Sequence, residues 1–398
     1  KPINPFIRLN FVIQKKSELT HPIYINGKGS ISALGNDQHS VIKSYKQAKN
    51  TFSFDEVSGV PVSRLTDDTE QALTHLQQED QRYKRLDRSV LMAMHAARQC
   101  VQAAGWQAGD YGINIGSSRG ATGLLEKYHQ GFLEQKRVHP LTSPTTTLGN
   151  IASWVGQDLQ NSGIRFSHSI TCSTALHALL NGVAWLNAGM TDKFLIGGSE
   201  APLTPFTISQ MQAVKLYSKL STDEACQSLE FDKKENTLVL GEAAAVFALS
   251  HVADHATAQI TGYGFASEKI TNHASISADA QCFQDSMSAA LRSAERSRVD
   301  AIVMHAPGTV KGDLAEYKAI QKTFTKLPAL TTNKWKIGHT FGASGAMSLE
   351  MALIMLDEQS LCENPFYNNA QQNGHLNSIM VNSVGFGGNA VSLIVERV

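Results

Sequence analysis

The amino-acid sequence predicts an α/β fold whose sheets are largely parallel and covered by helices. Apolar strands run into glycine turns and are followed by helical stretches, as at 111–116, 193–201 and 300–309. This alternation is typical of α/β proteins with buried sheets. No Pro/Ser/Gly-rich linker and no short repeat divides the 398 residues. We therefore expect two halves that pack into one body, and not a solenoid.

In the first part of the chain, each element follows from a local pattern. Residues 22–35 (HPIYINGKGSISAL) predict a strand that ends in a glycine-rich turn, and the polar segment 65–87 predicts a solvated loop or a surface helix. From Arg88 onward, apolar residues recur at helical spacing until Gly105 ends the helix. YGINIG (111–116) then predicts a short strand that leads into several glycines.

The same order of strand, turn and helix recurs in the rest of the chain. RFSHSI (165–170) leads to Cys172, and an apolar helix follows to about Ala188. Further strands are predicted at 193–201, 300–309 and 378–388, and a further helix at 314–324.

Composition and charge give no sign of a nucleic-acid or membrane partner. Lys+Arg and Asp+Glu both number 35, while 42% of residues are hydrophobic and 18% are charged, as in ordinary globular proteins. No stretch reaches the length of uninterrupted apolar sequence that a transmembrane helix needs. We therefore expect a cytoplasmic protein, on which a local basic patch could still bind an acidic partner.

The cysteines argue against both a disulfide framework and a zinc site. Five cysteines are widely spaced and form no CxxC pair, which favours a reducing cytoplasm. Residues 1–21 lack the apolar core of a signal peptide, and we expect them to be a leader or an extension without an assigned function.

Cys172 is the candidate nucleophile. It lies between a predicted strand and a predicted apolar helix. The free N–H groups and positive end of a helix N-terminus stabilise a thiolate, so we expect this position to lower the pKa of the thiol. A free cysteine is also a common small core residue, and that alternative stays open on position alone.

His305 and His339 are the candidate partners of this cysteine. His305 follows the apolar run AIVM (301–304), where ligand-binding groups gather in open α/β sheets, and His339 lies in the glycine-rich segment KIGHTFGASGA. Either could be a structural histidine. A metal site is disfavoured because the two form no HxH or HxxxH pattern, and no phosphate-binding glycine motif is complete.

At this point the chain resembles the elongating β-ketoacyl-acyl-carrier-protein synthases of the thiolase-like fold, from about Tyr24 to Glu396. The resemblance rests on four motifs in order: Thr171-Cys172-Ser173-Thr174; His305-Ala-Pro-Gly-Thr309 with Gly312-Asp313; Lys334 with His339 and Gly342-Ala-Ser-Gly345; and Asn382-Ser-Val-Gly-Phe-Gly-Gly388. It implies duplicated α/β halves, expected at 22–250 and 251–398, in a layered α-β-α-β-α body.

The chain departs from the family pattern at two positions near the expected site. Pro307 stands where the family has a Thr that contacts the pantetheine arm of the carrier, whereas Thr309 is retained. Ser348 stands where the family usually has a Glu that pairs with the Lys corresponding to Lys334, and Glu350 lies on a different helix face. We therefore do not expect the family's ion pair at Lys334.

The resemblance implies a decarboxylative Claisen condensation that needs no metal or nucleotide cofactor. Cys172 would take an acyl group from an acyl carrier protein, with the N–H groups of Cys172 and Phe386 as oxyanion hole. His305 and His339 would then stabilise the enolate formed from malonyl carrier, giving a 3-ketoacyl product two carbons longer. Phe386 is similar to the family's gating residue.

Within the superfamily, His339 favours chain elongation, because chain-initiating synthases have Asn there and thiolases use a second cysteine. Similarity around Asn333-Lys-Trp-Lys-Ile-Gly-His339 suggests a bacterial aryl-polyene pathway. A non-catalytic chain-length partner and a thiolase-like enzyme are the alternatives.

The family arrangement also implies a homodimer, or a heterodimer with a ketosynthase-like subunit. The contact would lie at a sheet edge beside the nucleophile strand, near KFLIGG (193–198) and the segment 139–156.

Overall fold

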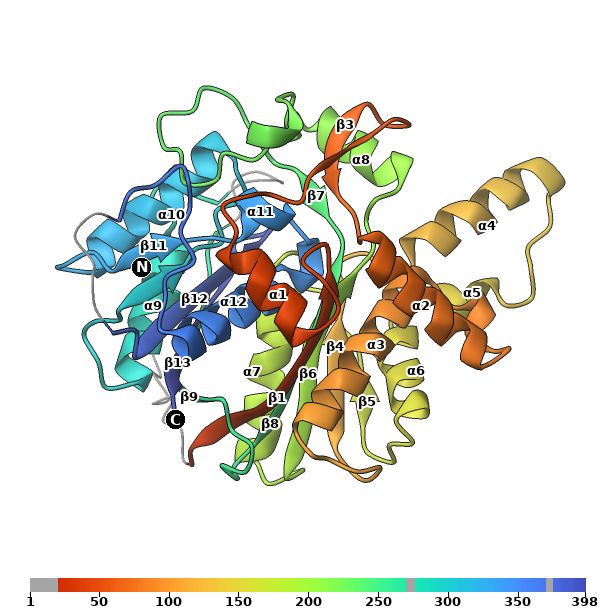
Figure 1. Ribbon diagram of the computed structural model, residues 1–398, viewed down its shortest axis with the longest axis horizontal. Helices are drawn as coiled ribbons and strands as arrows, with labels where there is room; N and C mark the ends of the chain where they lie inside the picture. The colour runs from red at the N-terminus through yellow and green to blue at the C-terminus, as the bar shows by residue number, and fades with distance from the viewer. Residues whose placement is uncertain (1–20, 270–275, 370–374) are drawn as a thin grey trace, which may run out of the picture.

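The computed structural model describes residues 21–269, 276–369 and 375–398, so residues 1–20 of the expected leader lie outside the described residues. Ten strands form one hydrogen-bonded sheet in the order β11-β10-β12-β13-β9-β1-β8-β6-β4-β5 (Figure 1). They are β1 (Ile23–Ser32), β4 (Gly112–Gly116), β5 (Arg165–Phe166), β6 (Lys193–Glu200), β8 (Ala243–Ser250), β9 (Ala258–Ser267), β10 (Ala301–Val303), β11 (Ala329–Thr331), β12 (Ser378–Gly385) and β13 (Asn389–Arg397).

A smaller sheet and twelve α-helices complete the described part of the chain. The small sheet contains β2 (Ser53–Asp55), β3 (Val60–Ser63) and β7 (Leu240–Gly241). The helices are α1 (Gln38–Lys46), α2 (Asp67–Glu79), α3 (Arg88–Ala103), α4 (Thr122–Gln135), α5 (Thr142–Thr146), α6 (Asn150–Asp158), α7 (Thr174–Asn187), α8 (Pro205–Ala213), α9 (Gln281–Ser293), α10 (Val310–Thr323), α11 (Lys334–Ile337) and α12 (Ser344–Glu358). Three 3₁₀ turns lie at Tyr83–Arg85, Thr222–Glu224 and Phe341–Ala343.

The large sheet consists of two halves with the same pattern of strand pairing. In β5-β4-β6-β8-β1, two parallel pairs are followed by two antiparallel pairs, and β11-β10-β12-β13-β9 repeats this order. The halves join through a short antiparallel contact between 23–25 of β1 and 258–260 of β9. The repeated order shows the duplication of the two halves. The expectation of a largely parallel sheet is wrong, because the pairs β6-β8, β8-β1, β12-β13 and β13-β9 are antiparallel.

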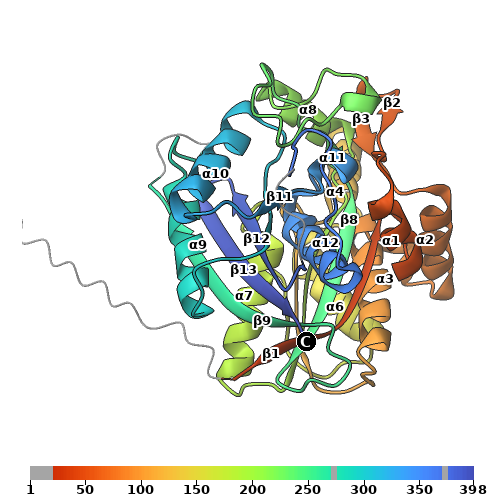
Figure 2. The ribbon, with the colours of Figure 1, turned by 60° about the vertical axis from the view of Figure 1, so that its left-hand side comes forward.

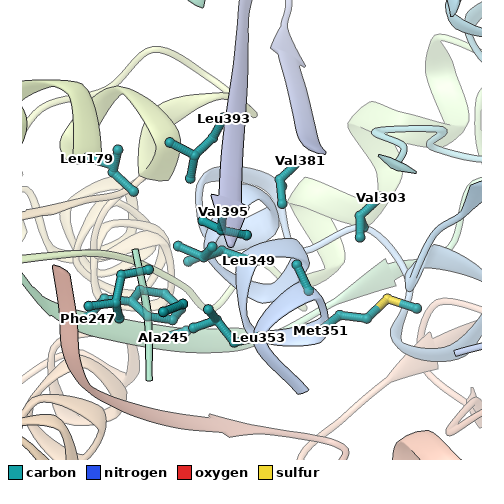
Figure 3. Packing of buried hydrophobic residues seen from close by; sticks show 14 of the residues in the cluster. Leu179, Ala245, Phe247, Val303, Leu349, Met351, Leu353, Val381, Leu393 and Val395 are labelled. Atoms are coloured by element: carbon teal, nitrogen blue, oxygen red, sulfur yellow. The ribbon is translucent and has the colours of Figure 1, made fainter. Parts of the chain in front are cut away.

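Three hydrophobic clusters divide the body into five layers, which confirms the expected α-β-α-β-α order (Figures 1 and 2). Helices α3 and α6 cover the outer face of the first half-sheet, and α9 and α10 cover the outer face of the second. Between the half-sheets lie α7 and α12, where Leu179 and Leu349 pack among Phe247, Val381 and Val395 (Figure 3). Alternate residues along each strand face different layers, as the period of two requires.

The strand β5, which precedes Cys172, is an edge of the large sheet, so the expected open edge is present. The segment 139–156 lies beside it, since α6 packs on β5 and the amide of Ala152 bonds to Ser167. The expectation for KFLIGG is wrong: it forms β6, which is paired on both sides and almost wholly buried. Its glycines allow neighbouring backbone to pack closely against a central strand, which the sequence pattern alone does not show.

Candidate active site

Cys172 lies in the turn between β5 and α7, just before the first residue of the helix. Hydrogen bonds shape this turn, with the amide of Ser173 donating to Ile170 O at 3.2 Å and Thr174 Oγ1 donating to Thr171 O at 2.6 Å. Thr171 takes a left-handed φ of 47°, a strained conformation for a β-branched residue and one that is frequent at functional turns. The side chain of Cys172 is 6% exposed and lines a cavity of about 820 Å³.

The pKa of the Cys172 thiol is raised to about 12, so the expected lowered pKa is wrong. Burial is the largest cause, and the carboxyl group of Glu200 raises the pKa further. The positive charges of Lys334 and Arg119 and the backbone N–H at Cys172 act in the opposite direction. The thiol form therefore dominates before substrate enters, because desolvation outweighs the helix N-terminus.

His305 and His339 line the same cavity as Cys172. Their ring centroids are 5.2 Å apart, with the rings nearly perpendicular at 84°. His305 follows β10, and His339 precedes α12, where its amide donates to Val239 O at 2.7 Å. The sequence placed both histidines in turns, and the structure brings these turns together at Cys172.

Burial keeps both imidazoles neutral. The pKa of His339 is lowered to about 3, first by burial and then by the charge of Lys334. The pKa of His305 is lowered well below its usual value by burial, His339 and Lys334. In both rings Nδ1 is buried and without a hydrogen-bond partner, which leaves Nε2 to act toward the cavity.

Lys334 is 1% exposed and pairs neither with Ser348, at the family position, nor with Glu350 nearby. Its Nζ donates to Asn333 Oδ1 at 3.2 Å, while Ser348 Oγ is buried without a partner. Glu350 accepts a hydrogen bond from Ser30 Oγ. Burial lowers the pKa of Lys334 to about 8, against the charge of Glu316, which raises it.

Glu316, on α10, is a site residue that the sequence reasoning missed. Its carboxylate accepts from the amides of His305 at 3.0 Å and Ala306 at 2.9 Å, and from Asn382 Nδ2 at 3.1 Å. Burial raises the pKa of this carboxyl group to about 7. Glu316 therefore fixes the backbone that carries His305. The sequence signal that could have identified Glu316 is its spacing of three residues from Asp313, which puts both acidic residues on one face of the helix.

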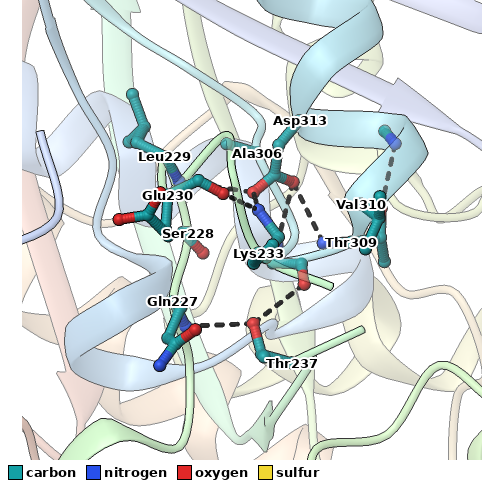
Figure 4. A network of polar contacts seen from close by, with 12 residues as sticks. Gln227, Ser228, Leu229, Glu230, Lys233, Thr237, Ala306, Thr309, Val310 and Asp313 are labelled. Atoms are coloured by element: carbon teal, nitrogen blue, oxygen red, sulfur yellow. Dashed lines mark hydrogen bonds and ion pairs between the residues drawn. The ribbon is translucent and has the colours of Figure 1, made fainter. Parts of the chain in front are cut away.

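Thr309 caps α10 and lines the cavity. Its Oγ1 accepts from the amide of Gly312 at 3.2 Å, as N-cap residues do. Asp313 accepts from the amides of Gly308 and Thr309 and pairs with Lys233 Nζ at 2.8 Å, within the network of Figure 4. Asp313 and Lys233 are both buried, so this ion pair fixes the turn after His305 in place.

Phe386 lies at the mouth of the cavity and is 41% exposed. Its loop packs against the nucleophile turn, since Ser383 Oγ donates to Cys172 O at 3.2 Å and Thr171 Oγ1 donates to Phe386 O at 3.4 Å. At Gly385 an added Cβ would lie 1.9 Å from Thr171 Oγ1, so only glycine allows this close approach.

Glu200, at the end of β6, was also missed. Fully buried, it accepts from the amides of Ser118 at 2.7 Å, Arg119 at 3.1 Å and Gly342 at 2.9 Å. Ser117 Oγ donates to it at 2.8 Å. Burial raises its pKa to about 6. This one carboxyl group ties the loop after β4 to the loop after His339.

No group of three or more His, Cys, Asp or Glu side chains in the described ranges could hold a metal ion. We also find no helix, in the part of the chain that the structure describes, with the length and apolar character to span a bilayer. The cytoplasmic location stays a prediction.

Comparison with known proteins places this chain in a family. Residues 21–255 match the family described as "Beta-ketoacyl synthase, N-terminal domain", and residues 257–367 match "Beta-ketoacyl synthase, C-terminal domain". A 3-oxoacyl-[acyl-carrier-protein] synthase 2 of Coxiella burnetii is 26% identical, covering 94% of this chain and 98% of that protein.

Solved structures share the fold. A type II polyketide synthase acyl-carrier protein in complex with its ketosynthase has a TM-score of 0.82 at 18% identity, covering 95% of this chain and all of that one. A ketosynthase in complex with its chain length factor from Xenorhabdus doucetiae has a TM-score of 0.78 at 18% identity, covering 95% and 98%. Since the two family matches span most of its length, the chain belongs to the β-ketoacyl synthase family.

Proposed function

We propose that this protein is an acyltransferase that condenses a carrier-bound acyl group with malonyl carrier, losing CO2 and giving a 3-ketoacyl product two carbons longer. The observation that carries the proposal is the meeting of Cys172, His305 and His339 in one cavity, from three turns far apart in sequence. A thiol nucleophile with two neutral imidazole donors is the set that acyl transfer and enolate stabilisation need.

In the first half-reaction, Cys172 attacks the acyl thioester and forms an acyl-enzyme. Because the pKa of the free thiol is raised, its proton passes during the attack to the departing sulfur of the carrier arm, and the positive end of α7 aids the loss of this proton from Cys172. The bond between the acyl group and the carrier breaks, and the carrier leaves as a free thiol. The negative oxygen that develops is stabilised by the N–H groups of Cys172 and Phe386, and the packing of the Phe386 loop against Cys172 supports this role.

In the second half-reaction, malonyl carrier enters and loses CO2. Nε2–H groups of His305 and His339 donate to the thioester oxygen as the enolate forms, and the enolate carbon attacks the acyl group on Cys172. The low pKa values support this assignment, because a ring that is neutral at pH 7 keeps one N–H that can donate and carries no charge of its own.

The shape and charge of the cavity support a carrier protein as partner. Lys234, Lys311 and Lys318 line it together with Pro307 and Thr309. Three exposed ammonium groups against one exposed carboxylate, that of Glu235, suit an acidic carrier and the phosphate of its arm. A structural neighbour is itself a ketosynthase bound to its acyl-carrier protein.

We propose that the protein works as a dimer, with itself or with a ketosynthase-like subunit. The open edge at β5 lies beside α6, and α4 with its loop to α5 projects from the body (Figure 1). Exposed Leu125, Phe132 and Leu133 on α4 suit a covered surface. Obligate interfaces bury more than about 2,000 Å².

The alternatives are weaker. A chain-length partner without catalysis would not need a cavity that Cys172 lines together with two histidines. A thiolase-like enzyme would need a second cysteine in this cavity, and Cys172 is the only cysteine among its lining residues. The role of the protein in a fatty-acid, polyketide or aryl-polyene pathway stays a prediction.

The test is mass spectrometry of the intact protein after incubation with acyl-loaded carrier, followed by addition of malonyl carrier. We expect the acyl mass on Cys172 in the first step and a 3-ketoacyl carrier in the second. Loading of the acyl group without any condensation product would contradict the proposal.

A further inference from the structure

The segment that carries Lys334 and His339 contains a second buried lysine, which the proposed mechanism does not use. Lys336 is 2% exposed, and it lies in α11, three residues before His339. Its Nζ donates to three backbone carbonyl oxygens, those of Ser44 at 3.0 Å, of Lys49 at 2.8 Å and of Gln47. Because a lysine ammonium has three N–H donors, these oxygens, here called the carbonyl cage, satisfy all of them.

The carbonyl cage lies at the C-terminal end of α1. This helix ends at Lys46, and the next residue, Gln47, is extended with φ −82° and ψ 136°, so the usual left-handed cap is replaced by another arrangement. The last carbonyl groups of a helix lack intrahelical donors and carry partial negative charge. The ammonium of Lys336 supplies the donors and the opposite charge. The Trp335 ring, whose centroid is 4.6 Å from Nζ, adds a further favourable contact for the cation.

The backbone of Lys336 is bound by the same segment that binds its side chain. The carbonyl oxygen of Lys336 accepts from the amide of Thr51 at 2.9 Å and from Thr51 Oγ1 at 2.8 Å. Residues 44–51 are themselves anchored, since Asn50 Nδ2 donates to Thr222 O at 2.9 Å. Five hydrogen bonds therefore fix Lys336, and with it α11, to residues 44–51.

The chain between Lys336 and His339 has little slack. Gly338 takes a φ of 68°, and a Cβ added there would lie 2.7 Å from Val239 O. The amide of His339 donates to the same oxygen at 2.7 Å, and the carbonyl of His339 accepts from the amide of Gly241 at 3.2 Å. The segment is thus held at Lys336 by residues 44–51 and at His339 by residues 239–241.

The direction of the His339 ring depends on this backbone. Within the described residues, its Nδ1 has no hydrogen-bond partner that could orient the ring. Only packing against the rings of His305 and Phe341, with centroids 5.2 Å and 5.5 Å away, adds to the effect of the backbone. Since the two histidines donate to one oxygen in the proposed mechanism, a displacement of about 1 Å can cost up to about 10²-fold in rate.

We infer that Lys336 is a positioning residue for malonyl decarboxylation: its ammonium, bound in the carbonyl cage, acts as an internal cation that fixes the segment carrying His339. The inference rests on the proposed function and adds a residue to it. Lys336 does not line the cavity of Cys172. Its effect on the reaction therefore passes through the backbone of α11, and no bond to substrate forms or breaks at this side chain.

The first test uses Lys336→Met, which keeps an apolar stem of similar length and removes the charge and its donors. Conversion of malonyl carrier to acetyl carrier should slow by about tenfold or more. Acylation of Cys172, measured by intact-protein mass spectrometry, should change by less than about twofold, because backbone N–H groups serve that step. A role in overall stability alone would instead lower both rates together. Lys46→Met is a matched control, because Lys46 lies on α1 but is exposed and pairs with Glu358, and both of its rates should stay native.

The second test is chemical rescue of Lys336→Ala. This variant lacks three carbons and the ammonium nitrogen, which n-propylammonium supplies as one molecule. Gln47 and Lys49 of the carbonyl cage are exposed residues, so a small amine can reach the cage from solvent. Propylammonium chloride should restore decarboxylation. Choline chloride at the same ionic strength should not, because choline has no N–H donor, and neither should n-propanol, which has a similar shape without charge.

Native decarboxylation by Lys336→Met, or an equal loss of both half-reactions, would overturn the inference. So would a folded Lys336→Ala that propylammonium does not rescue, or that n-propanol rescues equally well. If circular dichroism shows that one of the two variants does not fold, the other decides. In all of these cases the native protein still acylates Cys172 and decarboxylates malonyl carrier. Absence of either reaction in the native protein would instead contradict the proposed function.

Discussion

Replacing either cavity histidine by alanine should slow malonyl decarboxylation far more than acylation of Cys172. His305 and His339 are buried and neutral, with ring centroids 5.2 Å apart, so both can donate to one oxygen. The acyl group, in contrast, is transferred to Cys172 with the help of backbone N–H groups. The two half-reactions therefore depend on different donors.

The size of the effect follows from the loss of one donor to a developing negative charge. In a buried site such a loss costs about 3–4 kcal/mol, which is a factor of roughly 10²–10³ in rate. Water that enters the space left by the ring can donate a hydrogen bond in its place and restore part of the lost rate. We expect acylation of Cys172 to change by less than about tenfold, since the ring removed is not in the oxyanion hole.

Decarboxylation is measured as conversion of malonyl carrier to acetyl carrier, and acylation by mass spectrometry of the enzyme. His95→Ala is a matched control, because His95 is a half-buried histidine on α3 in an outer layer. Its removal should leave both half-reactions unchanged. If His305→Ala or His339→Ala decarboxylates at the native rate, the role proposed for that histidine is wrong.

Three further predictions concern the other groups of the site. Cys172→Ala should abolish acyl labelling while Cys226→Ala retains it, and labelled peptides after proteolysis would reveal any other nucleophile. Lys334→Ala should reduce condensation less than His339→Ala, because Lys334 forms no ion pair in the described residues, and steady-state rates of the two variants measure this. Glu316 has its pKa raised from 4.5 to about 7 by burial, so the stability linked to its protonated form is present below pH 4.5 and lost as pH rises to about 7. The full loss is about 3–4 kcal/mol. In urea denaturation, the free energy of unfolding of Glu316→Gln should fall less between pH 5 and 7.5 than that of the native protein, and an identical pH dependence would contradict the raised pKa.

The sequence was sufficient to predict the layered fold and the three residues that meet in the cavity. Cys172, His305 and His339 each follow or precede an apolar element at a glycine-rich turn, and such turns collect at one edge of a sheet. Local patterns of this kind can be recognised in the sequence because they depend only on residues that are close together along the chain.

Properties that depend on distant neighbours could not be predicted. The pKa of Cys172 is set by burial and by Glu200, which reaches it through folding alone. The antiparallel pairing in the large sheet brings together strands that are far apart in sequence, such as β1 and β8. Arg119 belongs to no motif, and folding alone brings its charge close enough to Cys172 to lower the pKa of the thiol.

The central layer has a consequence for how the chain matures during synthesis. Its helices α7 and α12 come from different halves, and so do Cys172 and the two histidines. A ribosome releases the first half well before the second, so a nascent chain contains the thiol without its partners. The apolar faces around α7 stay uncovered during this interval, which makes the partly synthesised chain a ligand for chaperones. The N–H of Phe386, which we propose for the oxyanion hole, also belongs to the second half, so we expect acylation of Cys172 only after that half has docked.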